Sequence, residues 1–200
     1  MKTIFQAKHI VILCLIGFVF SLRSQNTDLD ILESVNAKDY PMWDETMRWT
    51  SDGVYPFMVL STGGIWLKGY IDKDDAMMRN GYKTAISIAA NIALTEGLKR
   101  TIKRPRPYTD YPDQITLRTR KSGFSFPSGH TSCAFATATA LTMSTKKWYV
   151  AVPAFTYAGL VGYSRMRLGA HYGSDVLAGI IVGVGTSLLT WQVDRWINKQ

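Results

Sequence analysis

Apolar residues along this chain gather in stretches of helical length, separated by short polar segments. Small residues and helical spacing of the apolar positions favour close-packed helices, and strand signals are weak throughout. The pattern therefore predicts an all-α fold, an antiparallel bundle of five core helices, or six if the apolar run at 10–20 is counted. The predicted core helices are Val54–Ile71, Tyr82–Leu98, His130–Ser144, Trp148–Tyr163 and Ser174–Trp191.

Two of these stretches, Val54–Ile71 and Ser174–Trp191, approach the length that crosses a bilayer, which favours a transmembrane bundle. Short turns between antiparallel helices place alternate helix ends on the same side. The polar turns at 72–81 and 145–147 then fall on one side of the bundle. Segments 99–107, 127–130 and 164–175 fall on the other, and these three carry the candidate chemistry.

The N-terminal segment has the three-part pattern of a secretory signal: two lysines, an apolar run at 10–20, and a short segment with serines. The run is short for a membrane span, so we interpret residues 1–24 as a signal peptide or an uncleaved signal anchor. Either form would export the residues after it. We assign 25–53 to an exported polar and amphipathic segment, 54–193 to a helical-bundle domain, and 194–200 to a polar tail.

Charge is distributed unevenly along the sequence. The net charge is +8, and residues 99–121 hold eight basic residues against two acidic ones. Aromatic residues for base stacking are scarce in this window, so we expect no nucleic-acid partner. The two cysteines lie in apolar segments and suggest no disulfide framework and no metal site. We therefore expect neither a metal nor a cofactor.

The first candidate segment is Lys99, followed after six residues by Arg106 and Pro107. Pro105 and Pro107 stiffen the backbone that carries the Arg106 guanidinium, which suits preorganised anion binding. Lys99 ends a predicted helix, where the helix dipole favours a cation even without a ligand. We interpret the other basic residues nearby as surface charge: Arg100, Lys103 and Arg104.

The second segment, Pro127-Ser128-Gly129-His130, introduces the third helix. Ser128 is a good N-cap residue, Gly129 allows a ligand to approach the backbone, and free amides at a helix start bind anions. The same residues would equally serve as a simple helix cap. A protonated His130 is unfavourable near the positive end of the helix dipole, and a bound phosphate would supply its negative partner.

The third segment runs from Ser164 to Asp175. Arg165 can bind a phosphate through two donors, and His171 can act as a nucleophile. Asp175 comes four residues later and can hold the imidazole in one tautomer if the chain is helical there. A single His–Asp pair is more often a structural hydrogen bond. This pair therefore indicates a catalytic site only in combination with the candidate anion ligands upstream.

Together the three segments resemble the signature shared by type 2 phosphatidic acid phosphatases, bacterial class A acid phosphatases and vanadium haloperoxidases. The pattern is Lys-x6-Arg-Pro, Pro-Ser-Gly-His and Ser-Arg-x5-His-x3-Asp, and no motif position departs from it. The resemblance covers about residues 54–193. It implies a helical bundle of the acid phosphatase/vanadium-dependent haloperoxidase type and, for this chain, the membrane-type lipid phosphatase branch.

The resemblance also implies a metal-independent phosphatase that works through a phosphohistidine intermediate. His171 would attack phosphorus and Asp175 would fix its tautomer. His130 would protonate the leaving oxygen and then activate water. The ligands of the phosphate would be Lys99, Arg106, Ser128, the Gly129 amide and Arg165.

Three hypotheses are compatible with these expectations. The first is a phosphatase of the inner (cytoplasmic) membrane that acts on lipid phosphate monoesters or diphosphates at the periplasmic face. The second is a soluble periplasmic acid phosphatase, which the modest mean hydropathy favours. The third is a vanadium-dependent haloperoxidase, which the short chain disfavours. A non-enzymatic membrane scaffold is a further alternative, and the complete set of motif residues argues against it. The individual substrate and the oligomeric state stay open.

Overall fold

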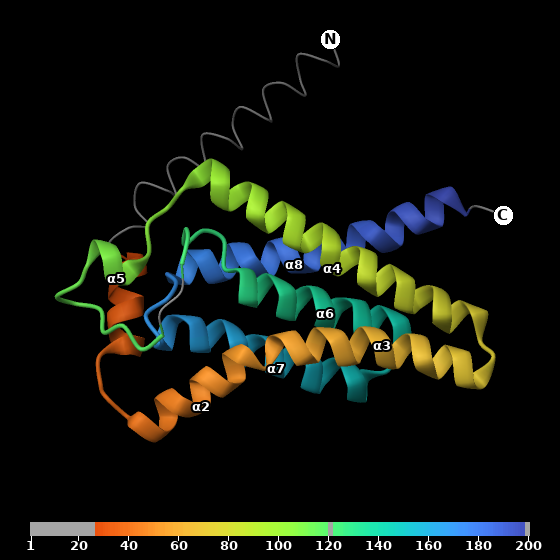
Figure 1. Cartoon of the computed structure of the whole chain (residues 1–200), viewed down its shortest axis with the longest axis horizontal. Coiled ribbons are helices and arrows are strands. Elements are labelled where there is room, and N and C mark those ends of the chain that lie inside the picture. Colours follow the sequence, from red (N-terminus) through yellow and green to blue (C-terminus); the bar gives the residue numbers. More distant parts are fainter. Residues whose placement is uncertain (1–26, 120–121, 199–200) are drawn as a thin grey trace, which may run out of the picture.

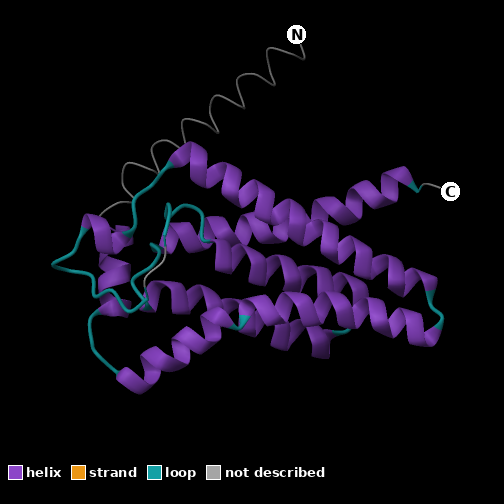
Figure 2. Cartoon of the chain, in the orientation of Figure 1, coloured by secondary structure: helices purple, strands orange, loops and turns teal. Residues whose placement is uncertain are grey.

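The computed structural model of the chain describes residues 27–119 and 122–198. Within these residues all regular structure is helical and no strand occurs, which confirms the predicted all-α class (Figure 2). The predicted signal peptide or anchor at 1–24 lies outside the described residues. The helices are α2 Pro41–Asp52, α3 Val54–Asp72, α4 Asp75–Ile102, α5 Pro107–Asp110, α6 Gly129–Thr145, α7 Trp148–Arg167 and α8 Gly173–Ile197, and residues 27–36 are also helical (Figure 1).

Helix α6 forms the centre of the bundle and packs against α3, α4, α7 and α8. It can approach them closely because its buried residues are small, Ala134 and Ala138 among them. The tightest approach is to α8: a Cβ atom added at Gly183 would lie 2.3 Å from Ser132 O and 2.9 Å from Ala136 N. Backbone therefore packs on backbone where α6 and α8 cross.

The helix ends follow the predicted alternation. The C-termini of α4 and α7 and the N-termini of α6 and α8 all lie at one end of the bundle, on the left in Figure 1. The α3–α4 and α6–α7 turns lie at the opposite end. All three motif segments are thereby brought to the same end of the molecule.

Three helices extend beyond their predicted boundaries. Helix α8 continues six residues past Trp191 to Ile197, so residues 194–197 of the predicted polar tail are helical. Helix α4 begins at Asp75 rather than at Tyr82, because the Asp74 side chain accepts a hydrogen bond from Met77 N at 2.9 Å and caps the helix there. The charged stretch predicted as a turn therefore forms the first turns of a helix. Helix α7 continues to Arg167, so that Arg165 lies in its last turn.

Helix α8 is, among the described residues, the one helix long and apolar enough to cross a membrane. Helix α3, which we also expected to approach that length, does not meet the same requirement of length and composition. Its apolar run is interrupted by polar residues, glycines and Lys68. Large apolar side chains are nevertheless exposed on the outside of both helices, for example Leu60 on α3 and Ile181 and Leu189 on α8.

Residues 27–36 and α2 cover the end of the bundle that holds the motif segments. Asn36 Nδ2 donates to the carbonyl oxygen of Arg167 at 2.9 Å, and Thr116 N donates to Asn36 Oδ1 at 2.8 Å. On α2, the buried Asp44 accepts from both Arg118 and Arg167. These contacts fix the N-terminal segment to the end of α7 and to the loop before α6.

We predict that Gly183→Ala lowers the stability of the bundle, whereas Gly185→Ala does not. The added methyl at 183 meets the backbone of α6, and overpacking of this kind costs about 1–3 kcal/mol. A Cβ at Gly185 meets nothing within 4 Å, so this variant gives only the intrinsic gain of alanine over glycine in a helix. Thermal unfolding of both variants in detergent measures the difference, and equal melting temperatures would contradict the packing described.

Candidate active site

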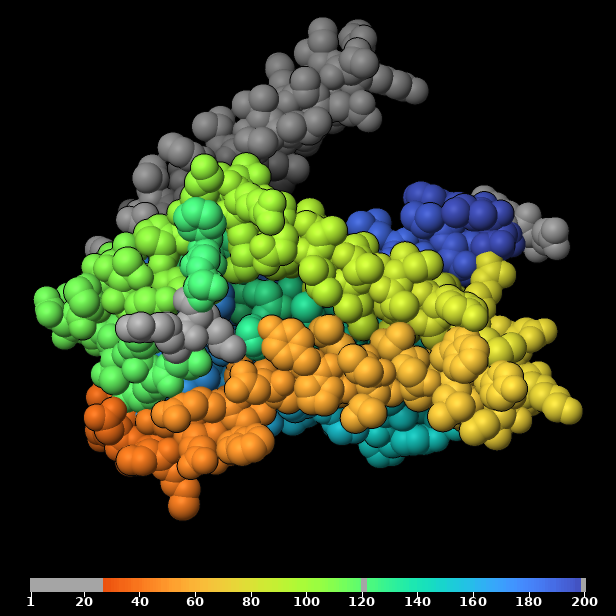
Figure 3. All heavy atoms as spheres, in the orientation of Figure 1, coloured from red at the N-terminus to blue at the C-terminus, as the bar shows by residue number. Residues whose placement is uncertain are grey.

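A cavity of about 550 Å³ opens at the motif-bearing end, between α3, α4 and α6. Figure 3 shows the hollow between α3 in orange and α4 in yellow-green, with α6 visible behind them. Six of the eight predicted site residues line this cavity: Lys99, Arg106, Gly129, His130, Arg165 and His171. The other two, Ser128 and Asp175, are fully buried and lie outside its lining.

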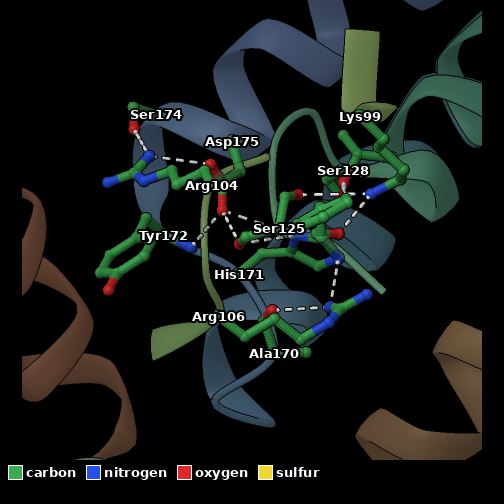
Figure 4. A network of polar contacts seen from close by, with 12 residues as sticks. Lys99, Arg104, Arg106, Ser125, Ser128, Ala170, His171, Tyr172, Ser174 and Asp175 are labelled. Atoms are coloured by element: carbon green, nitrogen blue, oxygen red, sulfur yellow. Dashed lines mark hydrogen bonds and ion pairs between the residues drawn. The ribbon is translucent and has the colours of Figure 1, made fainter. Parts of the chain in front are cut away.

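His171 and Asp175 form the predicted pair, although a different backbone arrangement brings them together. His171 lies in the turn before α8, and Asp175 lies in the first turn of α8, so the two do not share one helix. His171 Nδ1 is 3.5 Å from Asp175 Oδ2, the long hydrogen-bond distance that catalytic pairs commonly have before substrate binds. Asp175 Oδ2 also accepts from Tyr172 N at 3.0 Å and from the Ser125 hydroxyl (Figure 4).

The tautomer of His171 is set by its other neighbour. His171 Nε2 is 3.2 Å from Arg106 Nη1, and a guanidinium only donates hydrogen bonds. Nε2 must therefore accept, and the neutral ring carries its proton on Nδ1, which faces Asp175. Burial, together with the Arg165 and Arg106 guanidiniums, lowers the pKa of His171 to about 3, although Asp175 opposes this shift. The side chain is thus a neutral imidazole that lines the cavity, and its Nε2 lone pair accepts from Arg106.

Arg106 is held by the backbone around it. Its Nη1 donates to Ala170 O at 2.9 Å, its Nε to Gly123 O at 3.0 Å, and its Nη2 to Ser122 O at 3.1 Å. Lys99, in the last turn of α4, donates through Nζ to Phe124 O at 2.9 Å. The loop before α6 therefore fixes both cations at the cavity wall (Figure 4).

Arg165 is fully buried at the base of the cavity. Its Nη1 donates to Ser51 Oγ of α2 at 2.6 Å. Among the described residues, its Nε and Nη2 have no hydrogen-bond acceptor. A buried guanidinium with two remaining donors that faces a cavity is suited to an anion that accepts both.

The start of α6 contributes a further part of the cavity wall. Ser128 is the N-cap residue as predicted, but its hydroxyl lies 2.8 Å from Thr131 Oγ1 and does not cap the helix. Its amide donates to Asp175 O at 3.0 Å, which ties α6 to α8, and its predicted contact with phosphate stays a prediction. At Gly129 an added Cβ would meet only ordinary contacts, from 3.7 Å, so packing does not require a glycine there. His130 packs edge-on against Tyr55 of α3, with ring centroids 5.4 Å apart.

The arrangement brings side chains that are capable of acid–base and nucleophilic chemistry together with cationic side chains around one cavity. Four cationic side chains (Lys99, Arg100, Arg106 and Arg165), one carboxylate (Glu96), a neutral imidazole and a second histidine line one cavity. The sequence profile of the PAP2 superfamily matches residues 81–199 of the chain, more than half of its length. The chain belongs to the PAP2 superfamily. This confirms the resemblance inferred from the three motif segments.

Relatives in the PAP2 superfamily share both sequence and fold with the chain. It is 31% identical over 114 residues to an undecaprenyl-diphosphatase of Sulfolobus acidocaldarius, which covers 57% of this chain and 55% of that protein. It is 28% identical over 173 residues to a lipid A 4'-phosphatase of Bacteroides thetaiotaomicron, covering 78% and 72%. The match thus spans only about half the length of the first of these relatives.

The fold also matches a solved PAP2 structure. A transmembrane PAP2-type phosphatidylglycerolphosphate phosphatase from Bacillus subtilis superposes with a TM-score of 0.73 at 26% identity. The match covers 95% of each chain. The predicted architecture, a helical bundle of the kind found in transmembrane PAP2 proteins, is therefore confirmed.

Three residues of this PAP2 site were missed by sequence reasoning. Ser125 donates to Asp175, and Ser51 accepts from Arg165. Arg104, interpreted as surface charge, instead donates to Asp175 Oδ1 at 2.8 Å, so that interpretation is wrong. The turn of the chain after Ile102 points Arg104 towards α8, and nothing in the local sequence distinguished it from its basic neighbours.

We predict that His171 stays neutral, with its proton on Nδ1, from pH 5 to pH 8. Its pKa of about 3 lies below this range, and Arg106 excludes the other tautomer. The chain has three histidines, so ¹⁵N spectra of histidine-labelled protein in detergent are simple enough to read. His171→Gln identifies the signals, and a ring that titrates near 6.5 would contradict the assignment.

Proposed function

We propose that this chain is a metal-independent phosphatase that hydrolyses lipid phosphate monoesters or diphosphates through a phosphohistidine intermediate. One observation carries this proposal. His171, a neutral imidazole with a fixed tautomer, lines the same cavity as Lys99, Arg106 and Arg165, and its Nε2 atom lies against the Arg106 guanidinium. A nucleophile and a cluster of phosphate ligands thus surround one space large enough for a phosphoryl group.

In the first step His171 Nε2 attacks phosphorus, and the bond to the leaving oxygen breaks. The ring becomes an imidazolium, which the Asp175 carboxylate next to Nδ1 stabilises. Arg106 Nη1 leaves Nε2 and donates to an equatorial phosphate oxygen. Arg165, through Nε and Nη2, and Lys99 bind the remaining charge, which is spread over the equatorial oxygens in the transition state.

His130 supplies the proton for the leaving oxygen in the first step. In the second step it takes a proton from water, the water oxygen bonds to phosphorus, and the bond to His171 Nε2 breaks to release phosphate. Its position supports both roles, because it lines the cavity at the start of α6. A phosphate bound there stabilises the protonated form against the positive end of the helix dipole. His171 and His130 thus begin in opposite protonation states.

The apolar part of the cavity supports a lipid substrate. Beyond the cations, the cavity is lined by Val54, Tyr55 and Met58 of α3 and by Ile92 of α4. The hollow between these two helices in Figure 3 opens on the side of the bundle, where apolar side chains are exposed. The names of the relatives also support a lipid substrate, because undecaprenyl diphosphate, lipid A and phosphatidylglycerolphosphate are all lipid phosphates.

We further propose that the bundle lies in the inner membrane with its active site on the exported face. Helix α8 has the length and composition of a membrane span. Residues 27–36 and α2 come after the predicted export signal and pack on the end that holds the site. A chain whose N-terminal segment is exported brings that end of the bundle to the outer face.

We predict that the purified protein releases phosphate from lipid phosphates in the presence of EDTA and that His171→Ala abolishes this release. Three protein cations at the site take the part that Mg²⁺ plays in other phosphatases. The measurement is phosphate release from a panel of lipid and water-soluble esters, alongside detergent fractionation of membranes.

Recovery in the soluble fraction, with equal rates on water-soluble esters, would instead indicate a soluble acid phosphatase. Loss of activity in EDTA that Mg²⁺ restores would overturn the metal-independent mechanism.

We also predict that the effect of His130→Ala depends on the leaving group. Its role as acid contributes about 10²–10⁴-fold for an alkyl ester, whose oxygen needs a proton to leave. A p-nitrophenyl ester leaves without an acid, so the rate of the variant should fall much less with this substrate. Steady-state rates of both esters with wild type and variant test this, and an equal loss on both substrates would remove the role assigned to His130.

A further inference from the structure

Arg104 connects two carboxylates that come from opposite ends of the sequence. Its Nη1 donates to Asp175 Oδ1 at 2.8 Å and its Nη2 to Asp28 Oδ2 at 3.0 Å. The guanidinium also lies over the ring of Tyr172, 3.8 Å from the centroid. Nη1 also donates to the Ser174 hydroxyl at 2.7 Å, and Figure 4 shows its bonds to Asp175 and Ser174. The three hydrogen bonds and the ring contact hold the group in one orientation.

Asp28 is itself fixed by three groups. Its Oδ1 accepts from Ser174 N at 2.8 Å, and its Oδ2 accepts from the Ser174 hydroxyl as well as from Arg104. Ser174 is the second residue of α8, so the carboxylate lies at the positive end of that helix, where an anion is favoured. Asp28 is only 5% exposed, although it belongs to the helical residues 27–36, well before the bundle.

We propose that Arg104 and Asp28 are positioning residues of the active site, which act on His171 through Asp175. Asp175 presents Oδ2 to His171 Nδ1, and this oxygen is shared with Ser125 and Tyr172 N. Arg104 holds the other oxygen and so sets the rotation of the carboxylate. Asp28 in turn fixes Arg104. The N-terminal segment that carries Asp28 thereby contributes to the active site. Asp28 lies outside residues 81–199, which the PAP2 profile matches.

The alternative is an ion-pair network that only holds the segment onto α8. The two roles differ in what they change. A positioning role alters the orientation of Asp175, so it affects the chemical step and the contact between His171 Nδ1 and Asp175, while phosphate binding by Arg165, Lys99 and Arg106 is kept. A purely structural role alters thermal stability and leaves the properties of the folded site unchanged.

The experiment uses the full chain in detergent and compares matched variants. Asp28→Asn keeps the size and the acceptor for Ser174 N but removes the charge. Arg104→Lys keeps the charge but cannot donate to both carboxylates in the same fixed geometry. The test variants are Arg104→Ala, Arg104→Lys, Asp28→Asn and the double variant Arg104→Ala/Asp28→Asn. The controls are Lys103→Gln and Asp30→Asn, which change exposed residues of the same two segments.

For the kinetic readout, which rests on the proposed phosphatase function, we expect Arg104→Ala to lower kcat about 10- to 100-fold. KM should change less than about threefold, because the phosphate ligands remain. Arg104→Lys should recover part of the loss, and Asp28→Asn should show a smaller loss. Because Asp28 acts through Arg104, the double variant should be no slower than Arg104→Ala alone. A rise in KM with kcat unchanged, or additive losses in the double variant, would overturn the proposal.

The second readout is the ¹⁵N spectrum of His171, which requires no turnover. We expect Arg104→Ala and Asp28→Asn to shift the Nδ1 signal of His171, because its hydrogen bond to Asp175 weakens, whereas both controls match wild type. If wild type releases no phosphate, the proposed function fails and the spectra still decide the positioning role. If Arg104→Ala does not fold, the rates and spectra of Arg104→Lys and Asp28→Asn decide the positioning role. Unchanged kcat and unchanged spectra in these variants would leave a structural ion pair only.

Discussion

The buried carboxylate of Asp175 is the point on which the site depends. Its side chain accepts from Ser125, Tyr172 N and Arg104 and faces His171, and its backbone carbonyl accepts from Ser128 N. One residue therefore joins the loop after α4, the start of α6 and the turn before α8. A buried anion is tolerated only when its charge is matched and its oxygens are hydrogen-bonded, so these segments must converge for the bundle to be stable.

The cations around the cavity impose the complementary constraint. Lys99, Arg106 and Arg165 face the same space and repel one another, so each must be held by something other than its neighbours. Backbone carbonyls hold Lys99 and Arg106, and Ser51 holds Arg165. A site prepared in this way is complementary to the charge of a phosphoryl group before any substrate arrives, which is how electrostatic preorganisation stabilises a transition state.

The bundle provides the rigid frame for this convergence. Small residues on α6 and glycines on α8 allow the two backbones to touch, which fixes the positions of the helix ends that carry the motifs. The same construction leaves large apolar side chains on the outside of α3 and α8 and a hollow between α3 and α4. Polar chemistry at one end and an apolar flank beside it are consistent with a phosphorylated lipid as substrate.

The helices and the residues proposed to bind and attack a phosphate could be predicted from the sequence alone, because helical periodicity and motif spacing are local properties. The sequence placed Lys99, Arg106, Arg165 and both histidines at the correct end of the bundle. Which oxygen of Asp175 faces His171, and that Arg104 binds the other one, could be seen only in the folded chain. Arg104 and Asp28 are 76 residues apart, and Arg165 and Ser51 are 114 apart. Such pairs depend on how distant segments pack, and no local pattern in the chain encodes that packing.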